Sequence, residues 1–191
     1  QVLHCPYTAP KAKLVVREMT DLLVLDLVEK GLVTDQMVLT VGYDIDNPQY
    51  QGDVTIDYYG RKVPKHAHGT ENLAQYTSSA RLIVSAMMQL YERIVDKNLM
   101  VRRVNLTAGN IIEAQKLAEP VKAPAQMSLF QEEDSQKTAD ETEALEKEKQ
   151  LQQAVVALRQ KFGKNAVLKG INLEEGATAQ ERNRQIGGHK A

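Results

Sequence analysis

The chain is poor in the residues that build large aromatic cores or covalent frameworks. It has no Trp, only two Phe and a single Cys among 191 residues. Any core must therefore rest mainly on aliphatic side chains. The lone Cys5 excludes an intrachain disulfide and fits a reducing compartment, so we expect a cytoplasmic protein. No apolar run approaches the length of a membrane-spanning helix, and the N-terminus lacks a signal-peptide pattern, so no membrane partner is expected.

The charge balance is close to neutral. The formal net charge is −1, so no global basic field indicates a nucleic-acid partner, although phosphate binding needs only a local basic strip. The length allows one domain of ordinary size with a tail, or two small domains. The chain begins with Gln1 rather than Met. We therefore expect it to be processed or cut from a longer protein.

The first part of the chain, residues 1–112, is predicted to form one compact domain. Apolar residues recur at helical spacing after Thr8 and Pro10, and Gly31 is placed to end that helix in a left-handed conformation. A second amphipathic helix is predicted over residues 78–96. Strands are predicted at residues 2–4, 36–43, 73–76 and 100–112. The resulting β-α-β-β-α-β order predicts an α+β fold, with two helices on one face of a four-stranded sheet and the other face open.

The character of the chain changes after residue 112. Residues 120–124 (PVKAP) indicate a stiff linker, and residues 132–148 hold eight acidic residues against two lysines, which favours a solvated, mobile stretch. An amphipathic helix is then predicted from Leu145 to Phe162, ending at Gly163. The expected organisation is a domain over 1–112, a linker over 113–140 and a helical tail over 141–191.

One short segment in the linker stands out. It is the pentapeptide Gln126, Met127, Ser128, Leu129 and Phe130, which places two large apolar residues on chain expected to be flexible. Such residues are normally buried in globular proteins, so the segment indicates a peptide anchor whose leucine and phenylalanine fill a partner's apolar pocket. The pentapeptide resembles the bacterial sliding-clamp binding motif. The alternative is that its apolar side chains pack back on the domain.

Longer stretches of the chain carry a second resemblance. They are VREMTDLLVLDLVEKGLVTDQMVLTVGYD, DYYGRKVPKHAHGTENLAQYTSSARLI and FGKNAVLKGINLEEGATAQERNRQIGGHKA. Together with the predicted element order, they resemble the C-terminal part of UmuC-like (ImpB/MucB/SamB) Y-family polymerases of Gram-positive bacteria, the little-finger domain and its tail. The resemblance implies a role in error-prone lesion bypass and DNA repair, with double-stranded primer-template DNA and the sliding clamp as partners.

In that family the little finger lays its sheet in the DNA major groove, and a separate palm holds the Mg²⁺ ions of nucleotidyl transfer. No part of this sequence resembles the palm signature, so neither catalytic residues nor a cofactor are expected on this chain; Mg²⁺ is implied only for the catalytic core. The candidate DNA-binding residues are local and mostly basic: Arg61, Lys62, Lys65, His68, Thr70, Arg102 and Arg103. The strands bearing the two groups of cations are expected to be neighbours, so that the cations form one strip.

The same residues also allow other interpretations. Each candidate cation could simply belong to a solvated basic patch. His66 and His68 with His4 and Cys5 lack the spacing of a zinc site, so no metal is expected. A function of a different class is a non-catalytic adaptor that binds proteins through the acidic stretch and the C-terminal helix. Apolar surface left exposed on that helix could also produce self-association as an artefact of truncation.

Overall fold

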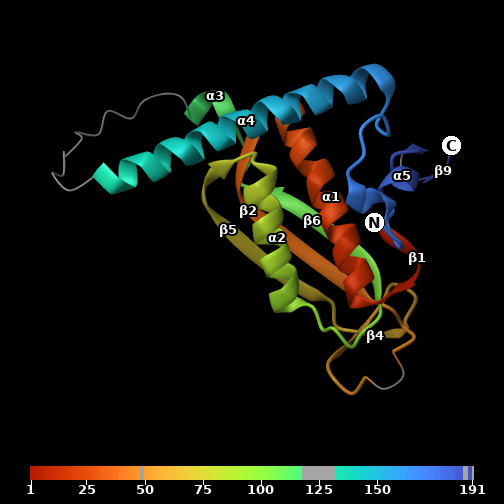
Figure 1. The fold of residues 1–191 in the computed structure, drawn as a ribbon. Coiled ribbons are helices and arrows are strands. Elements are labelled where there is room, and N and C mark those ends of the chain that lie inside the picture. Colours follow the sequence, from red (N-terminus) through yellow and green to blue (C-terminus); the bar gives the residue numbers. More distant parts are fainter. Residues whose placement is uncertain (48–49, 118–131, 187–188, 191) are drawn as a thin grey trace.

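The computed structural model describes residues 1–47, 50–117, 132–186 and 189–190. It has a mixed architecture in which helices pack on an antiparallel sheet (Figure 1), in agreement with the predicted α+β class. The elements up to residue 117 are β1 (Val2–Tyr7), α1 (Ala9–Glu29), β2 (Leu32–Tyr43), β3 (Val54–Ile56), β4 (Lys62–Pro64), β5 (Ala67–Thr77), α2 (Ala80–Ile94), β6 (Val101–Gly109), β7 (Ile112–Glu113) and α3 (Ala114–Leu117).

The main sheet is organised around β2. Its strands lie in the order β1-β6-β2-β5, all antiparallel, and β7 pairs with the start of β2. Leu39 of β2 stands opposite Gly69 of β5 on one side and Leu106 of β6 on the other. Because both edges of β2 are paired along most of its length, its side chains are held in a fixed register.

The strand order overturns one expectation from the sequence. β5 and β6 were predicted to be neighbours, but β2 lies between them. Lys62 also belongs to a separate two-stranded ladder, in which β3 pairs with β4, and not to the main sheet. The physical reason is that β2 is long enough, at twelve residues, to pair with a complete strand on each edge. A shared central strand cannot be recognised from the composition of the outer strands.

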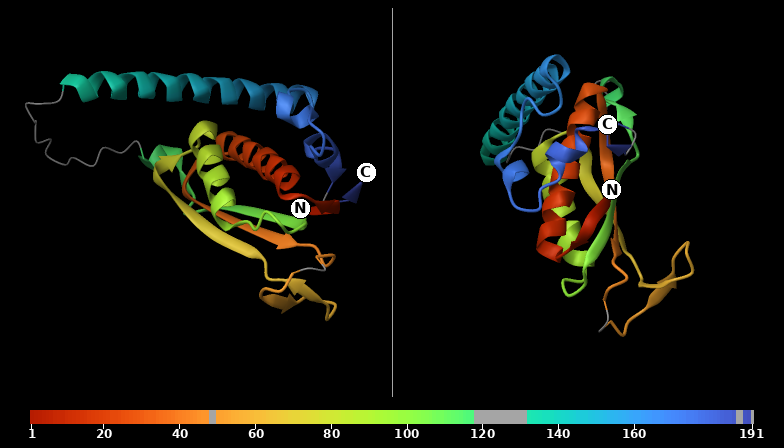
Figure 2. Two further views of the ribbon diagram at one scale, coloured as in Figure 1. Left: turned by 60° about the horizontal axis from the view of Figure 1, so that its bottom comes forward. Right: turned by 90° about the vertical axis from the view of Figure 1, so that its right-hand side faces the viewer.

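Helices α1 and α2 cover one face of this sheet (Figures 1 and 2). Ser79 caps the start of α2, because its Oγ accepts the N–H of Leu82 at 3.3 Å. The helix turns Ile83, Met87 and Leu90 toward the sheet. α1 ends just before Gly31, which has φ of +66°, as the sequence predicts. The core between the layers is aliphatic apart from a few tyrosines, as the scarcity of Trp and Phe requires.

The short β3–β4 ladder forms a hairpin beyond one end of the main sheet (Figures 1 and 2). Its three-residue strands pair Val54 with Pro64, Thr55 with Val63 and Ile56 with Lys62. Gly60 closes the turn with φ of +77°, a conformation that costs little only for glycine. The hairpin is thus an addition to the six elements predicted for residues 1–112.

The C-terminal part also differs from the sequence expectation. A single helix, α4, runs over Glu132–Phe162, so the acidic stretch predicted to be mobile is helical. Helix-forming Glu, Lys, Gln and Ala dominate this segment, and their propensity outweighs the expected charge repulsion. The later elements are η1 (Gly170–Leu173), α5 (Ala179–Arg182), β8 (Gln185–Ile186) and β9 (His189–Lys190). The division into a linker over 113–140 and a tail over 141–191 remains a prediction.

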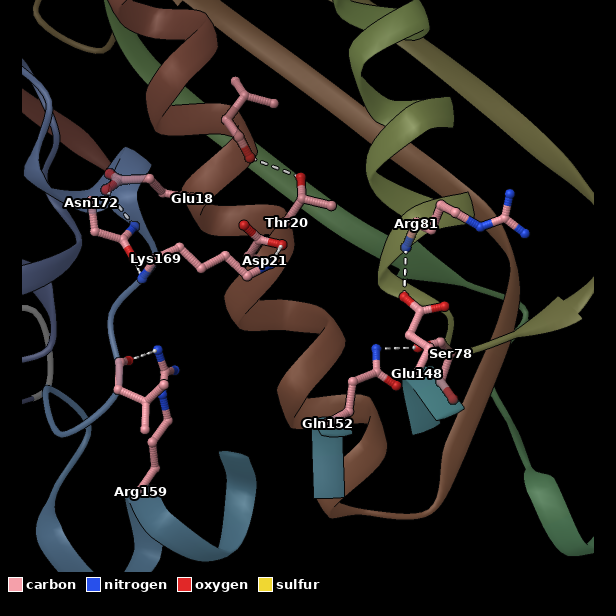
Figure 3. Close-up of polar contacts among 12 residues, drawn as sticks. Glu18, Thr20, Asp21, Ser78, Arg81, Glu148, Gln152, Arg159, Lys169 and Asn172 are labelled. Carbon is pink, nitrogen blue, oxygen red and sulfur yellow. Dashed lines mark hydrogen bonds and ion pairs between the residues drawn. The ribbon is translucent and has the colours of Figure 1, made fainter. Parts of the chain in front are cut away.

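α4 lies across the helical layer, on the side away from the sheet (Figure 2). Its Glu148 carboxylate accepts the backbone N–H of Arg81 at 2.9 Å and the hydroxyl of Ser79, so it caps the start of α2 (Figure 3). One turn later, Gln152 Nε2 donates to the carbonyl oxygen of Ser78 at 3.1 Å. The helix therefore binds its own domain through polar contacts at the start of α2.

The chain after α4 returns to α1. Lys169 forms an ion pair with Asp21 of α1, and Asn172 Nδ2 donates a 2.8 Å hydrogen bond to Glu18 Oε1 (Figure 3). The Glu18 side chain is buried, with 2 % of the residue exposed. A cavity of about 350 Å³ remains between α1, α4 and this returning segment. No helix among the described residues is long and apolar enough to cross a membrane.

Candidate nucleic-acid interface

The sheet face opposite the helices is open and polar. Alternation along β2 buries Met37, Leu39 and Val41 against the helices and turns Gln36 and Thr40 to the other face. The neighbouring strands add further polar side chains to that open face: His68, Thr70 and Asn72 from β5, and Arg103, Asn105 and Thr107 from β6. A broad polar surface therefore runs across three strands.

Hydrogen bonds between strands hold part of this surface in place. The Thr40 hydroxyl lies 2.8 Å from Nδ1 of His68, and Gln36 Nε2 donates to Asn72 Oδ1 at 3.0 Å. Both pairs cross from β2 to β5. Side chains that are already ordered lose less conformational entropy when a ligand binds. The β2–β5 part of the open face is therefore preorganised for polar contacts.

Arg103 supplies a cation at the end of this face. It stands opposite Gly42 of β2 and Val2 of β1. A Cβ placed on Gly42 would lie 3.3 Å from Cβ of Arg103, so the two residues lie on the same face. Arg103 is exposed, and among the residues that the structure describes no carboxylate forms an ion pair with it. Its guanidinium group is thus available to a phosphate.

Arg102 occupies a different environment from its neighbour. The β2–β6 ladder has an irregularity here, where Gly42 pairs with Arg103 and Tyr43 with Val101. Arg102 is half-buried, and its Nε lies 3.7 Å from Oδ2 of Asp44. Arg102 and Arg103 therefore do not both point fully to the same face.

The remaining cations lie on or beside the β3–β4 hairpin. Arg61 precedes β4 and donates to the Asp57 carboxylate from Nε at 2.8 Å and from Nη2 at 2.7 Å. This contact lowers the pKa of Asp57 and raises that of Arg61. Lys65 lies 3.9 Å from Asp53, and Lys62 is exposed. The hairpin cations are therefore partly balanced by carboxylates of the hairpin itself.

A groove of about 700 Å³ separates the hairpin from the end of the sheet. Arg61 and Tyr59 line it on the hairpin side, whereas Arg102, Arg103 and Asn105 line it on the sheet side. One hairpin cation, Arg61, thus shares a groove with Arg102 and Arg103 although the strands are not neighbours. The hairpin brings Arg61 back over the end of the sheet, which residue spacing alone could not predict. Lys62 and Lys65 do not line this groove.

The chain also matches a known protein family. Residues 5–129 match the model of the impB/mucB/samB family C-terminal domain, which covers more than half of the chain. The chain belongs to this family. Domains of this family form the C-terminal region of Y-family DNA polymerases. A search of curated proteins found no match to the chain.

Two other sequence predictions concern this impB/mucB/samB domain. The proposed clamp-binding residues, Gln126 to Phe130, lie outside the described residues. Within the part of the chain that the structure describes, no cluster of three or more His, Cys, Asp or Glu could hold a metal ion. His66 and His68 instead contact each other edge to face, with ring centroids 6.5 Å apart, and His4 packs in the same way on Tyr7.

Several polar residues of the open face were missed by the sequence analysis. The sequence analysis named mainly cations and residues near them, and it therefore left out Gln36, Thr40, Asn72 and Asn105. The alternation of residues 36–43 contained the signal for the first two, since every second residue of this strand is large and apolar. Tyr58 and Tyr59 were also missed, because the short strands beside them show no clear period.

Proposed function

We propose that the open sheet face of this impB/mucB/samB domain binds the sugar-phosphate backbone of duplex DNA and does not read the DNA sequence. The observation that carries this proposal is the one-sided cover of the sheet. α1, α2 and α4 all lie on the same side, which leaves a polar face across β5, β2 and β6 accessible. Polar side chains and a free guanidinium group are the donors that phosphate oxygens accept.

The charge distribution supports contacts with the backbone over contacts with base edges. Arg103 is exposed and lacks a carboxylate partner within the described residues, whereas Arg61 and Arg102 have Asp57 and Asp44 beside them. His68 and Thr70 lie on β5, across β2 from Arg103, and offer short polar groups. Contacts of this kind position a duplex and tolerate any sequence, as a polymerase requires.

The second part of the proposal concerns the linker. Gln126 to Phe130 would tether the domain to a bacterial sliding clamp, with Leu129 and Phe130 as the apolar anchors. Each buried anchor contributes about 1.5–3 kcal/mol. Ordering of the segment opposes this gain, so we expect an exchangeable complex of about micromolar strength. The support for this part is the sequence pattern alone.

The test of DNA holding is a binding titration of the 191-residue chain against blunt duplex DNA at several salt concentrations. We expect two duplexes of unrelated sequence to bind equally well. Arg103→Ala should weaken binding to both and reduce the slope of log K against log salt by about 1. The matched control is Arg17→Ala, because Arg17 is an exposed arginine on α1, in the layer that covers the opposite face.

Equal losses in the Arg103 and Arg17 variants would contradict a role for the open face. Absence of DNA binding even at low salt would favour the alternative function, an adaptor acting through the acidic stretch and the C-terminal helix. That alternative has less support, because Glu148 and Gln152 of this helix already bind the start of α2 in the same chain.

A further inference from the structure

The β3–β4 hairpin exposes two adjacent aromatic rings. Tyr58 is 95 % and Tyr59 76 % exposed, and their rings meet edge to face with centroids 5.4 Å apart. Both residues also line the groove between the hairpin and the sheet. Tyrosine rings carry a large apolar surface that proteins usually cover at least in part. Two such rings side by side at a hairpin tip indicate a surface that stacks on a ligand.

The tip that carries these rings is held firmly. Asp57 Oδ1 accepts the backbone N–H groups of Tyr59 and Arg61, each at 2.9 Å, and Asp57 Oδ2 accepts the side chain of Arg61. The guanidinium carbon of Arg61 lies 5.1 Å from the centre of the Tyr59 ring, within cation–π range. One carboxylate thus fixes the turn, the ring and the cation relative to one another, so little ordering remains when a ligand binds.

The opposite wall of the groove carries two guanidinium groups. Arg102 and Arg103 line it, and Arg103 has no carboxylate partner within the described part of the chain. Of the three carboxylates on the groove wall, Asp57 is bound by Arg61, and Asp44 accepts the backbone N–H of Asp46 at 2.9 Å. Asp46 is exposed to solvent. The groove therefore pairs aromatic faces on one wall with guanidinium groups on the other.

We propose that this groove binds unpaired nucleotides of a single-stranded extension next to the duplex on the sheet. The inference rests on the proposed DNA-holding function and extends it to a second class of DNA structure. Single strands offer unstacked base faces together with phosphates, and proteins bind them by combining aromatic platforms with cations. Tyr58 and Tyr59 stack on the bases, and Arg103 contacts a phosphate of the same strand. Every base has an aromatic face, so this binding is independent of sequence.

The test compares two DNA probes by fluorescence anisotropy with the full 191-residue chain. One probe is a blunt duplex, and the other is the same duplex with a short single-stranded extension. We expect the wild type to bind the extended probe roughly fivefold or more tightly, the lower end of what one base–aromatic stack contributes. Tyr58→Ala/Tyr59→Ala should remove this preference and leave affinity for the blunt duplex unchanged. Tyr58→Phe/Tyr59→Phe should keep it, because the rings remain.

Phe162→Ala serves as the matched control. Phe162 is also an exposed aromatic residue with a cation over its ring, Lys161 at 5.2 Å, but it lies at the end of α4. The control should retain the preference for the extended probe.

A wild type that binds both probes equally would overturn the inference and leave duplex holding intact, as expected if the tyrosines dock on a protein surface. An equal loss on both probes in the double alanine variant would overturn it too. Failure of the wild type to bind either probe would count against the proposed function itself.

Discussion

The backbone N–H of Thr178 donates a 2.8 Å hydrogen bond to Oε2 of Glu18, which lies 160 positions earlier in the chain. The same oxygen accepts the N–H of Ala179 at 3.1 Å, and Oε1 accepts Asn172. A carboxylate on α1 thus caps the start of α5 and holds η1. The tail that follows the proposed clamp segment is therefore attached to the same helix that packs against the sheet.

Removal of this carboxylate should release the C-terminal segment. Glu18→Ala leaves several buried donors without an acceptor, and each buried unsatisfied group costs about 1–3 kcal/mol. We expect the free energy of unfolding to fall by about 3 kcal/mol, measured by urea denaturation. Limited proteolysis should show faster cleavage within residues 163–185.

The control for this change is Glu29→Ala. Glu29 also lies on α1 and accepts a hydrogen bond from the C-terminal part, from Gln160 Nε2 at 2.9 Å, but it is exposed. We expect its effect to stay within about 0.5 kcal/mol. Similar effects of both substitutions would mean that Glu18 is not a special attachment point.

Glu92 should make the thermal stability of the protein depend on pH. Hydrogen bonds from Lys13 and then Lys97 lower the pKa of Glu92 from 4.5 to about 2. A carboxyl group with a lowered folded-state pKa stabilises the protein above its ordinary pKa, and this contribution is lost as the pH falls from 4.5 toward 2. Glu92→Gln should therefore lower the melting temperature slightly near neutral pH, and its difference from the wild type should shrink across that window.

The comparison for Glu92 is Glu146→Gln, which changes an exposed glutamate on α4. Its difference from the wild type should not vary between the same two pH values. A constant deficit for Glu92→Gln at every pH would show that its ion pairs with Lys13 and Lys97 do not account for its contribution.

Gly69 allows α2 to approach β5 closely. A Cβ at this position would lie 2.9 Å from Cγ2 of Ile94 and 2.9 Å from Cδ1 of Leu90. Gly69→Ala should therefore force the core side chains to shift and cost about 1–3 kcal/mol in chemical denaturation. Gly170→Ala is the control, because a Cβ there meets nothing within 4 Å. Equal stability of both variants would mean that α2 moves away from β5 without cost.

The clamp segment is tested by Leu129→Ala/Phe130→Ala in a pull-down with purified bacterial sliding clamp. Loss of two apolar anchors should weaken binding at least about tenfold, since each contributes about 1.5–3 kcal/mol. Binding to duplex DNA should persist. Leu158→Ala/Phe162→Ala is a matched control, because it removes the same residue types from the exposed surface of α4. Loss of DNA binding together with clamp binding would mean that Leu129 and Phe130 support the fold.

Residue patterns predicted much of the local structure. The helical spacing of apolar residues predicted α1 and α2, because burial on one face imposes a period that each helix's own residues carry. The β-branched and apolar residues of 36–43 predicted β2. The family resemblance also came from the sequence. The sequence also indicated part of the open face, since the residues that alternate with Met37, Leu39 and Val41 along β2 had to face away from the helices.

Only the tertiary structure decided which of these elements meet. The place of β2 between β5 and β6, the groove that joins Arg61 to Arg103, and the cap of Glu18 on α5 all join residues far apart in the chain. Each depends on pairing or hydrogen-bonding groups that almost every segment possesses, so no local pattern selects the partner. Apolar periodicity determines an element's buried face, but the partner across it is chosen by the packing of the whole chain.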